Sequence, residues 1–326
     1  MKQLKIKLLL FSATVLGLAS CLKEGSPNID TNNAGNIVQF SNTGNNSAAV
    51  SSKYPNFYTD LGSLAEGSTA EFNLNISYSG SGTAPEDITV NLVVDNDLLT
   101  LFNTQNGTSY VIPPTSVYSV PASVVIKKGT RTTQAKATVT RSADYDFGEA
   151  YAIPLSISSA SSGIISDNFG KSVYSFGVRN QFDGDYAMDI KSTGWAAYGI
   201  ADGPTLTWPT NIGLVTTGAN TLIIADYARS GDALQPAFTS DNESVTAFGA
   251  TSPQFTIDPT TYAVSVINTS ADDGRGRTLS NDPAAGPTDN IYDPATKTIH
   301  ALYIMKQTGR VDQHFAVTFT FVAPRP

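Results

Sequence analysis

The strongest pattern in the chain is a regular alternation of apolar and polar residues from about residue 37 onward. In one stretch the apolar residues are Phe72, Leu74, Ile76 and Tyr78, and polar residues separate them. Residues 88–94 show the same alternation with Ile88, Val90, Leu92 and Val94. Because successive side chains of a β-strand point to opposite faces, this spacing predicts strands with one buried face.

The first half of the chain is predicted to form a sandwich of two sheets. We expect strands at 71–78, 88–94, 124–126, 135–139, 151–157 and 173–178, and a short helical turn at 97–105. Short strands with one apolar face are buried most simply by packing two sheets together, which predicts an Ig-like β-sandwich over residues 37–178. Pro154 has no backbone N–H, so we expect it at a sheet edge or a bulge.

The second half, residues 179–326, is predicted to be a separate antiparallel β domain that begins at Arg179-Asn180-Gln181. Gly218-Ala219 and residues 258–261 lie between apolar runs and predict hairpin turns. Successive hairpins form a meander, which is either a sandwich or a partly closed barrel. The expected strands cover 185–190, 212–217, 220–227, 237–239, 255–257, 262–267, 298–305 and 315–322.

The N-terminal segment has the pattern of a lipoprotein signal peptide over residues 1–20. Lys2, Lys5 and Lys7 precede an apolar run at 8–18, and Ala19-Ser20 leads to Cys21, the only cysteine of the chain. An apolar run this short is typical of a signal peptide and cannot span a bilayer. We therefore expect cleavage before Cys21 and a lipid anchor at this residue, with a diacyl group on its thiol and palmitate as a further chain. The polar residues 21–36 are expected to be a flexible tether.

The charge of the chain limits its partners. It has 20 basic and 28 acidic residues, and the leader contains three of the basic ones, so the mature chain carries a net charge of −11. Nucleic-acid binding needs clustered Lys and Arg, so nucleic acid is not expected as a partner. Attachment to a membrane is expected through the lipid alone. With its one cysteine lipidated, the chain has no thiol left for a disulfide or a metal cluster.

The sequence predicts no enzyme and no cofactor. The two histidines, His300 and His314, lie in expected strands, and no Gly-x-Ser-x-Gly motif accompanies them. The acidic residues lie mostly in turns rather than at positions where two carboxylates would flank a glycosidic bond. Asp272 and Asp273 precede a glycine in the long loop 268–289 and are weak candidates for calcium, with a solvated turn as the favoured alternative.

The aromatic residues are the best candidates for a binding site. Trp195, Tyr198 and Trp208 lie in one irregular stretch, 191–211, which is rich in Gly, Pro and Thr. Aromatic rings offer flat apolar faces against which the C–H face of a sugar can stack. The alternative is that these rings close one end of the second domain's core.

Several motifs resemble those of a known family. The series Tyr110-Val-Ile-Pro-Pro114, Tyr118, Val125-Ile126 with Gly129, and Tyr151-Ala-Ile-Pro-Leu-Ser-Ile157 resembles the N-terminal domain of unknown function in Bacteroidota lipoproteins of polysaccharide-utilisation loci. Phe182-Asp-Gly-Asp-Tyr186 resembles the start of the β domain that follows it there. Lys23-Glu24 resembles the surface-export signal of these lipoproteins, with Gly25 in place of the second acidic residue.

The resemblance implies an outer-membrane lipoprotein, displayed at the cell surface, that captures a polysaccharide or oligosaccharide without catalysis. It also implies a neighbouring outer-membrane transporter complex as a partner. The alternative is a structural or adhesive surface lipoprotein that binds another protein through sheet edges or loops.

Overall fold

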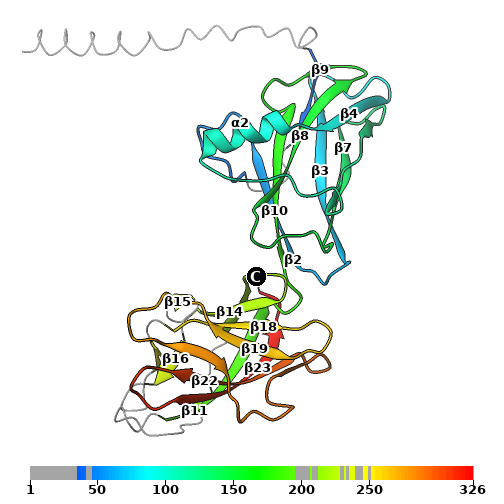
Figure 1. Ribbon diagram of the computed structural model, residues 1–326. Helices are drawn as coiled ribbons and strands as arrows, with labels where there is room; N and C mark the ends of the chain where they lie inside the picture. Colours follow the sequence, from blue (N-terminus) through cyan, green and yellow to red (C-terminus); the bar gives the residue numbers. More distant parts are fainter. Residues whose placement is uncertain are drawn as a thin grey trace, which may run out of the picture.

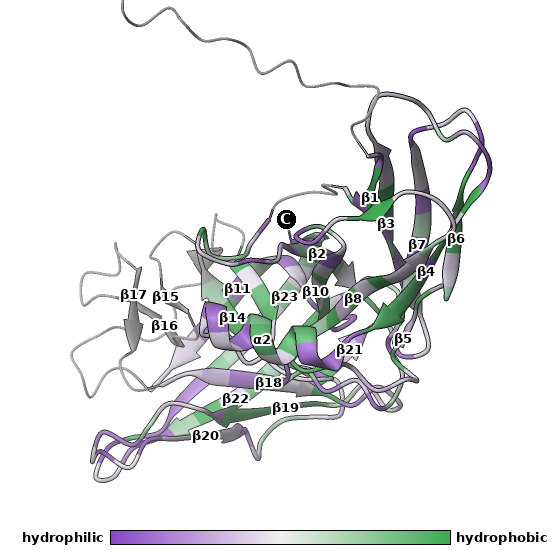
Figure 2. Cartoon of the chain, turned by 90° about the horizontal axis from the view of Figure 1, so that it is seen from above, coloured by the Kyte–Doolittle hydropathy of each residue, from purple (hydrophilic) through white to green (hydrophobic). Residues whose placement is uncertain are grey.

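The structure is a computed structural model that describes residues 35–41, 46–194, 206–207, 212–227, 231–232, 235–238, 245–248 and 251–325. The described chain is almost entirely β, as predicted, and forms two domains arranged end to end (Figure 1). Hydrophobic residues are concentrated in the strands, for example in β4, whereas many connecting segments are polar (Figure 2).

The first domain is a sandwich of two five-stranded sheets. One sheet has the order β5-β7-β3-β1-β9 and the other β2-β10-β8-β4-β6. Two of the strand pairs are parallel, β1 with β9 and β2 with β10, so this domain is not purely antiparallel. The strands are β1 (Ile37–Phe40), β2 (Asn56–Ser63), β3 (Thr69–Ser79), β4 (Ile88–Val94), β5 (Tyr118–Ser119), β6 (Ser123–Ile126), β7 (Thr132–Thr140), β8 (Tyr151–Ala160), β9 (Ile164–Ile165) and β10 (Lys171–Arg179).

Tyr174 of β10 lies at the centre of the sandwich core. Its ring centre is 5.9 Å from that of Phe40 and 5.8 Å from that of Phe72, so it contacts rings from the opposite sheet. The alternating residues of β3, including Leu74 and Ile76, are fully buried in the same core, as the pattern predicted. Close packing of these rings stabilises the contact between the two sheets.

Helix α2 (Asn96–Asn106) covers the outer face of the second sheet. Its buried residues Leu98, Leu99 and Phe102 pack against Ala152 and Val173, which face away from the sandwich core. Strand β8 is therefore buried on both faces, which explains why residues 151–157 form a nearly continuous apolar run rather than an alternating one.

Both ends of α2 have ordinary helix caps. Asp95 precedes the helix and accepts a hydrogen bond from Leu98 N at 3.0 Å, and Gly107 follows it with a φ of 64°. The Asp95 carboxylate also accepts hydrogen bonds from Ser156 Oγ at 2.5 Å and Lys171 Nζ at 2.9 Å. Burial opposes its ionisation, but these three donors outweigh burial and lower the pKa of Asp95 to about 2.

Pro154 is not in an edge strand, so that part of the prediction is wrong. It lies in β8, between β10 and β4, opposite Val173. Val173 donates its N–H to Pro55 on the far side, so the Pro154 nitrogen faces β4. Strand β4 ends beside it, with Val94 opposite Leu155. Asp95 N still donates to Pro154 O at 3.0 Å, so only the one bond that a Pro154 N–H would donate is missing.

The second domain is built on one 11-stranded sheet that curls into a nearly closed barrel. Its main path is β19-β18-β14-β13-β11-β23-β22-β20, with β12, β15 and β21 attached. The strands are β11 (Gly184–Thr193), β12 (Leu206–Thr207), β13 (Ile212–Thr216), β14 (Thr221–Asp226), β15 (Gly231–Asp232), β18 (Pro253–Ile257), β19 (Val264–Asn268), β20 (Thr278–Asn281), β21 (Ile291–Asp293), β22 (Thr298–Lys306) and β23 (Gln313–Ala323), and β16 (Gln235–Phe238) pairs with β17 (Val245–Phe248).

Both predicted hairpins are present, between β13 and β14 and between β18 and β19. The expected long loop 268–289 is not entirely a loop, because it contains strand β20, which pairs with β22. In β23 the alternation is as predicted: Phe315, Val317 and Phe319 are buried in the barrel, together with Phe255 and Tyr303. Large aromatic rings thus fill the barrel interior.

Asparagine side chains close the barrel where β19 meets β20. The Asn281 side chain accepts from Val266 N at 2.9 Å and donates to Val264 O at 2.8 Å, as a peptide group of a paired strand would. Asn268 Nδ2 donates to Arg277 O at 3.2 Å across the same seam. The seam therefore has no long open strand edge on either side.

We expect the substitution D95A to lower the free energy of unfolding by about 2 kcal/mol, because it removes a helix cap and leaves Ser156 and Lys171 without their acceptor. Because the folded-state pKa is lowered, the difference from the wild type should be full above the ordinary pKa of 3.8 and fade as the pH falls to about 2. Urea unfolding across this pH range measures it. The exposed neighbour D97A serves as control, and equal losses in both variants would contradict the capping role.

We expect N281A to lower the free energy of unfolding by about 2 kcal/mol, since two hydrogen bonds at the barrel seam are lost. The exposed Ser265 on β19 provides the control S265A. Hydrogen exchange should show faster exchange of the Val266 amide in N281A only. Unchanged protection of that amide would show that the side chain does not close the barrel.

Candidate functional site at the domain junction

The two domains meet at the segment between β10 and β11, where a buried carboxylate is surrounded by donors. The Asp183 side chain is fully buried and accepts from Thr216 N and Thr216 Oγ1, both at 2.8 Å. Arg325 binds it through two nitrogens, at 2.8 and 3.1 Å. Such a bidentate guanidinium–carboxylate pair fixes the orientation of the two side chains as well as the distance between them.

Arg179 extends this pairing into the first domain. Its guanidinium contacts Asp60 of β2 and lies 3.7 Å from Asp183, and it donates to Arg325 O at 2.7 Å. One continuous set of charges therefore joins β2, the linker and the segment after β23. Because Arg179, Asp183 and Arg325 are largely buried, solvent screens the charges of these three side chains less than it screens exposed ion pairs.

Neutral hydrogen bonds hold the linker on both sides. Asn180 is fully buried and donates through Nδ2 to Gly218 O at 2.9 Å and Thr221 O at 3.0 Å. From the first domain, Arg141 donates to Ala219 O at 3.1 Å. These bonds seat the β13–β14 hairpin against the sandwich, so the linker is a fixed connection.

The Asp-Gly-x-Tyr motif has a physical explanation at this place. Asp183 is the buried carboxylate, and Tyr186 is a core residue whose OH donates to Phe182 O at 2.8 Å. Gly184 lies against β23, where a Cβ would be only 2.6 Å from the ring of Phe321. Only glycine allows β11 and β23 to pair this closely beside the junction.

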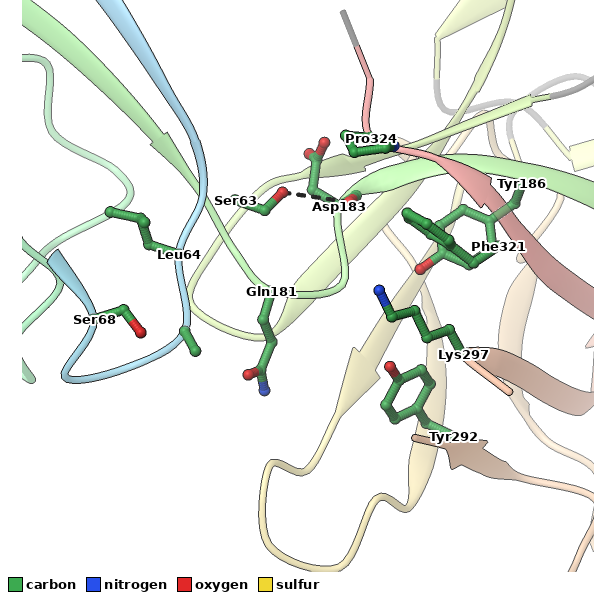
Figure 3. A pocket seen from close by; sticks show the side chains of 11 residues that line it. Ser63, Leu64, Ser68, Gln181, Asp183, Tyr186, Tyr292, Lys297, Phe321 and Pro324 are labelled. Carbon is green, nitrogen blue, oxygen red and sulfur yellow. Dashed lines mark hydrogen bonds between the residues drawn. The ribbon is translucent and has the colours of Figure 1, made fainter. Parts of the chain in front are cut away.

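A groove of about 390 Å³ opens beside the buried carboxylate (Figure 3). One wall is the β2–β3 turn of the first domain, and the other comes from β11, β21, β23 and the turn between β21 and β22. The lining residues are Ser63, Leu64, Ala65, Ser68, Gln181, Asp183, Tyr186, Tyr292, Lys297, Phe321 and Pro324.

Aromatic rings form the second domain's wall of this groove. Tyr292 packs edge-on against Phe182 at 5.0 Å, and Phe321 packs edge-on against Tyr186 at 5.5 Å. Tyr292 and Phe321 are half-buried, so part of each ring faces the groove. Burial raises the pKa of Tyr292. Its OH can donate a hydrogen bond at neutral pH, as any tyrosine hydroxyl can. The groove combines ring faces, a hydroxyl, the Gln181 amide and an ammonium group.

Four of the residues that the sequence singled out lie outside the described part of the chain. These are Cys21, Trp195, Tyr198 and Trp208. Their roles as lipid attachment site and sugar platform therefore stay predictions.

The loop with Asp272 and Asp273 has internal partners for its carboxylates. Asp272 accepts from Gly274 N at 3.0 Å and Gly276 N at 3.2 Å. Asp273 lies 3.5 Å from Arg275 and 3.7 Å from Arg277. Two guanidinium groups at this carboxylate compete with a cation, and within the described residues no group of three metal-ligating side chains is found.

The two histidines face the outside of the barrel. His300 Nδ1 lies 3.2 Å from Thr318 Oγ1, and His314 contacts Asp282. The hydrogen bond from His314 lowers the pKa of Asp282. Neither arrangement places a serine nucleophile against a histidine.

Across the described residues, no helix has the length and apolarity needed to cross a bilayer.

The residues that form the exposed aromatic wall of the groove and its ammonium group were not predicted as site residues. Phe321 lay inside the expected strand 315–322 without an assigned role, and Tyr292 and Lys297 lay in no predicted element. The available signal was the turn-forming segment Asp293-Pro-Ala-Thr between two short β stretches, which indicates a hairpin and therefore an exposed loop.

Comparison with known proteins gives a match for the first domain. Residues 40–164 match a family model that describes an N-terminal domain. A structure of unknown function from Bacteroides ovatus superposes with a TM-score of 0.55 at 13% identity, covering 89% of this chain and 95% of that one. This similarity shows the same fold. The resemblance to two-domain β proteins of the Bacteroidota is confirmed at this level.

Two further solved structures are similar to a smaller extent. One, from Bacteroides ovatus, is provisionally described as a carbohydrate-binding protein and has a TM-score of 0.36 at 13% identity, covering 89% of this chain and 99% of that one. The other is a Bacteroides thetaiotamicron protein solved with a Man5GlcNAc product, with a TM-score of 0.32 at 17% identity over 38% of this chain and 28% of that one. The comparison with curated proteins found no significant match.

We expect D183N to lower the free energy of unfolding by about 3 kcal/mol, because two guanidinium groups at the junction lose the charge that compensates them. Small-angle scattering should also show a larger radius of gyration, since the linker is no longer fixed. The control is D167N, which removes an exposed partner of Lys53 and should change neither quantity. An unchanged radius of gyration in D183N would show that other contacts set the domain arrangement.

Proposed function

We propose that this protein is a lipid-anchored cell-surface protein that binds oligosaccharides without catalysing a reaction on them. The observation that carries the proposal is the junction groove, in which the rings of Tyr292 and Phe321 lie beside the Gln181 amide and the Lys297 ammonium. Sugars present both apolar C–H faces and hydroxyls, and this combination of ring faces and polar groups suits them.

The proposed location follows from the N-terminal sequence. The leader that ends at Cys21 supports attachment to the outer membrane, and Lys23-Glu24 supports export to the cell surface. A tether of residues 22–36 would hold the two β domains away from the lipid. A protein at this place would deliver bound oligosaccharides to an outer-membrane transporter complex.

We expect Y292A and F321A each to weaken oligosaccharide binding about tenfold, because each removes one ring face from the groove. Isothermal titration of the mature protein in detergent, with a panel of plant and host oligosaccharides, measures this. F169A, at an exposed ring of the first domain, is the control and should leave binding unchanged. Melting curves check that each variant is folded.

A double variant, W195A with W208A, separates the two candidate sites. Retained binding in this variant places the site in the groove, and lost binding there with unchanged Y292A assigns it to the predicted tryptophan platform. If no oligosaccharide of the panel binds to the folded protein, the proposal is wrong and the adhesive alternative is favoured.

A further inference from the structure

Lys297 has a backbone conformation that a lysine rarely adopts. It ends the turn between β21 and β22 with a φ of 52°, in the left-handed region that favours glycine or asparagine. A residue held in this region stores about 1 kcal/mol of strain or more. Thus a glycine would fit the turn better than the lysine that occupies it.

The Lys297 side chain reaches across the groove. Its ammonium nitrogen lies 4.6 Å from the centre of the Phe321 ring, and Figure 3 shows it extending between Tyr292 and Phe321 toward Gln181. The ring face attracts the cation and holds it in this position. A ring face satisfies only one side of an ammonium group that has three N–H donors.

The charges around the groove leave this ammonium available. Asp183 is the acidic residue of the lining, and its carboxylate is buried and bound to Arg325. Asp293, in the same hairpin, accepts from Ala295 N at 2.9 Å and Thr296 Oγ1 at 2.7 Å. Among the described residues no carboxylate forms a salt bridge with Lys297. The groove therefore presents a positive charge on a chain whose mature net charge is −11.

We propose that the groove selects acidic oligosaccharides, with Lys297 binding a carboxylate or sulfate group of the sugar. The anion would accept hydrogen bonds from the Lys297 ammonium, the Gln181 amide and the Tyr292 hydroxyl, and the sugar ring would lie against the aromatic wall. A charge-assisted hydrogen bond is stronger than the bonds that neutral hydroxyls make. This inference rests on the proposed function, because it names the class of glycan that the same groove takes.

The test compares acidic oligosaccharides with their neutral counterparts on the mature protein in detergent. The probes are oligogalacturonate against its methyl ester, oligomannuronate against its methyl ester, and chondroitin sulfate oligomers against their desulfated and esterified forms. We expect at least one acidic member to bind about tenfold more tightly than its neutral counterpart, with a preference that falls as salt is raised.

Two variants of Lys297 separate a binding role from a structural one. K297M keeps the apolar stem over Phe321 and removes the charge, and it should abolish the preference for the acidic member. K297G should abolish the same preference while leaving the melting temperature equal or higher, because it relieves the backbone strain. The control K191M removes an exposed lysine of β11 that does not line the groove and should keep the full preference.

Three results would overturn the inference. If neutral oligosaccharides bind as tightly as acidic ones and K297M binds normally, the glycan-binding function stands and the selectivity is refuted. If acidic oligosaccharides are preferred but K297M keeps the preference, the anion is bound elsewhere. If no oligosaccharide binds to the folded protein, both the selectivity and the proposed function are refuted.

Discussion

The arrangement of this molecule depends on one buried carboxylate. Asp183 lies where the two domains meet, without contact to water, and a charge in that place requires compensation by donors from its surroundings. Thr216 and Arg325 come from the second domain, and Arg179 connects the same centre to Asp60 in the first. A side chain that needs all these partners at once also determines how the strands that carry them lie. The groove exists because the two domains are held at this fixed distance.

Elsewhere in the structure, backbone polar groups next to an apolar core would lack partners. Short polar side chains bind these groups. The amide of Asn281 replaces a peptide group at the barrel seam, and Asn290 bonds in the same way to both backbone groups of Leu302. In the first domain, Asp95 caps the single described helix while that helix covers a sheet face that would otherwise be exposed. Each device closes an edge or an end without adding a strand.

The elements predicted best from the sequence are those that bury one face and expose the other. Alternation identified β3, β4 and β23 with nearly correct ends. The short helical turn expected at 97–105 is part of a full helix, α2, which extends one residue further at each end. The prediction was poorer where tertiary contacts override the local pattern. Pro154 occupies an inner strand because the neighbouring strand stops beside it, and β20 is a strand only because it pairs with β22. The groove was not predicted because Gln181, Lys297 and Phe321 are far apart in sequence and meet only through barrel closure and domain packing.

The position of Arg325 has a mechanical consequence. The second domain is connected to the first through the start of β11, and Arg325, just after the end of β23, binds back to that same point. Strands β11 and β23 are also hydrogen-bonded neighbours along nearly their whole length. A force that pulls the second domain away from the first would therefore act both on the linker and on the bond between Arg325 and Asp183. Separating the two domains would therefore load the hydrogen-bond ladder between β11 and β23 as well as the linker.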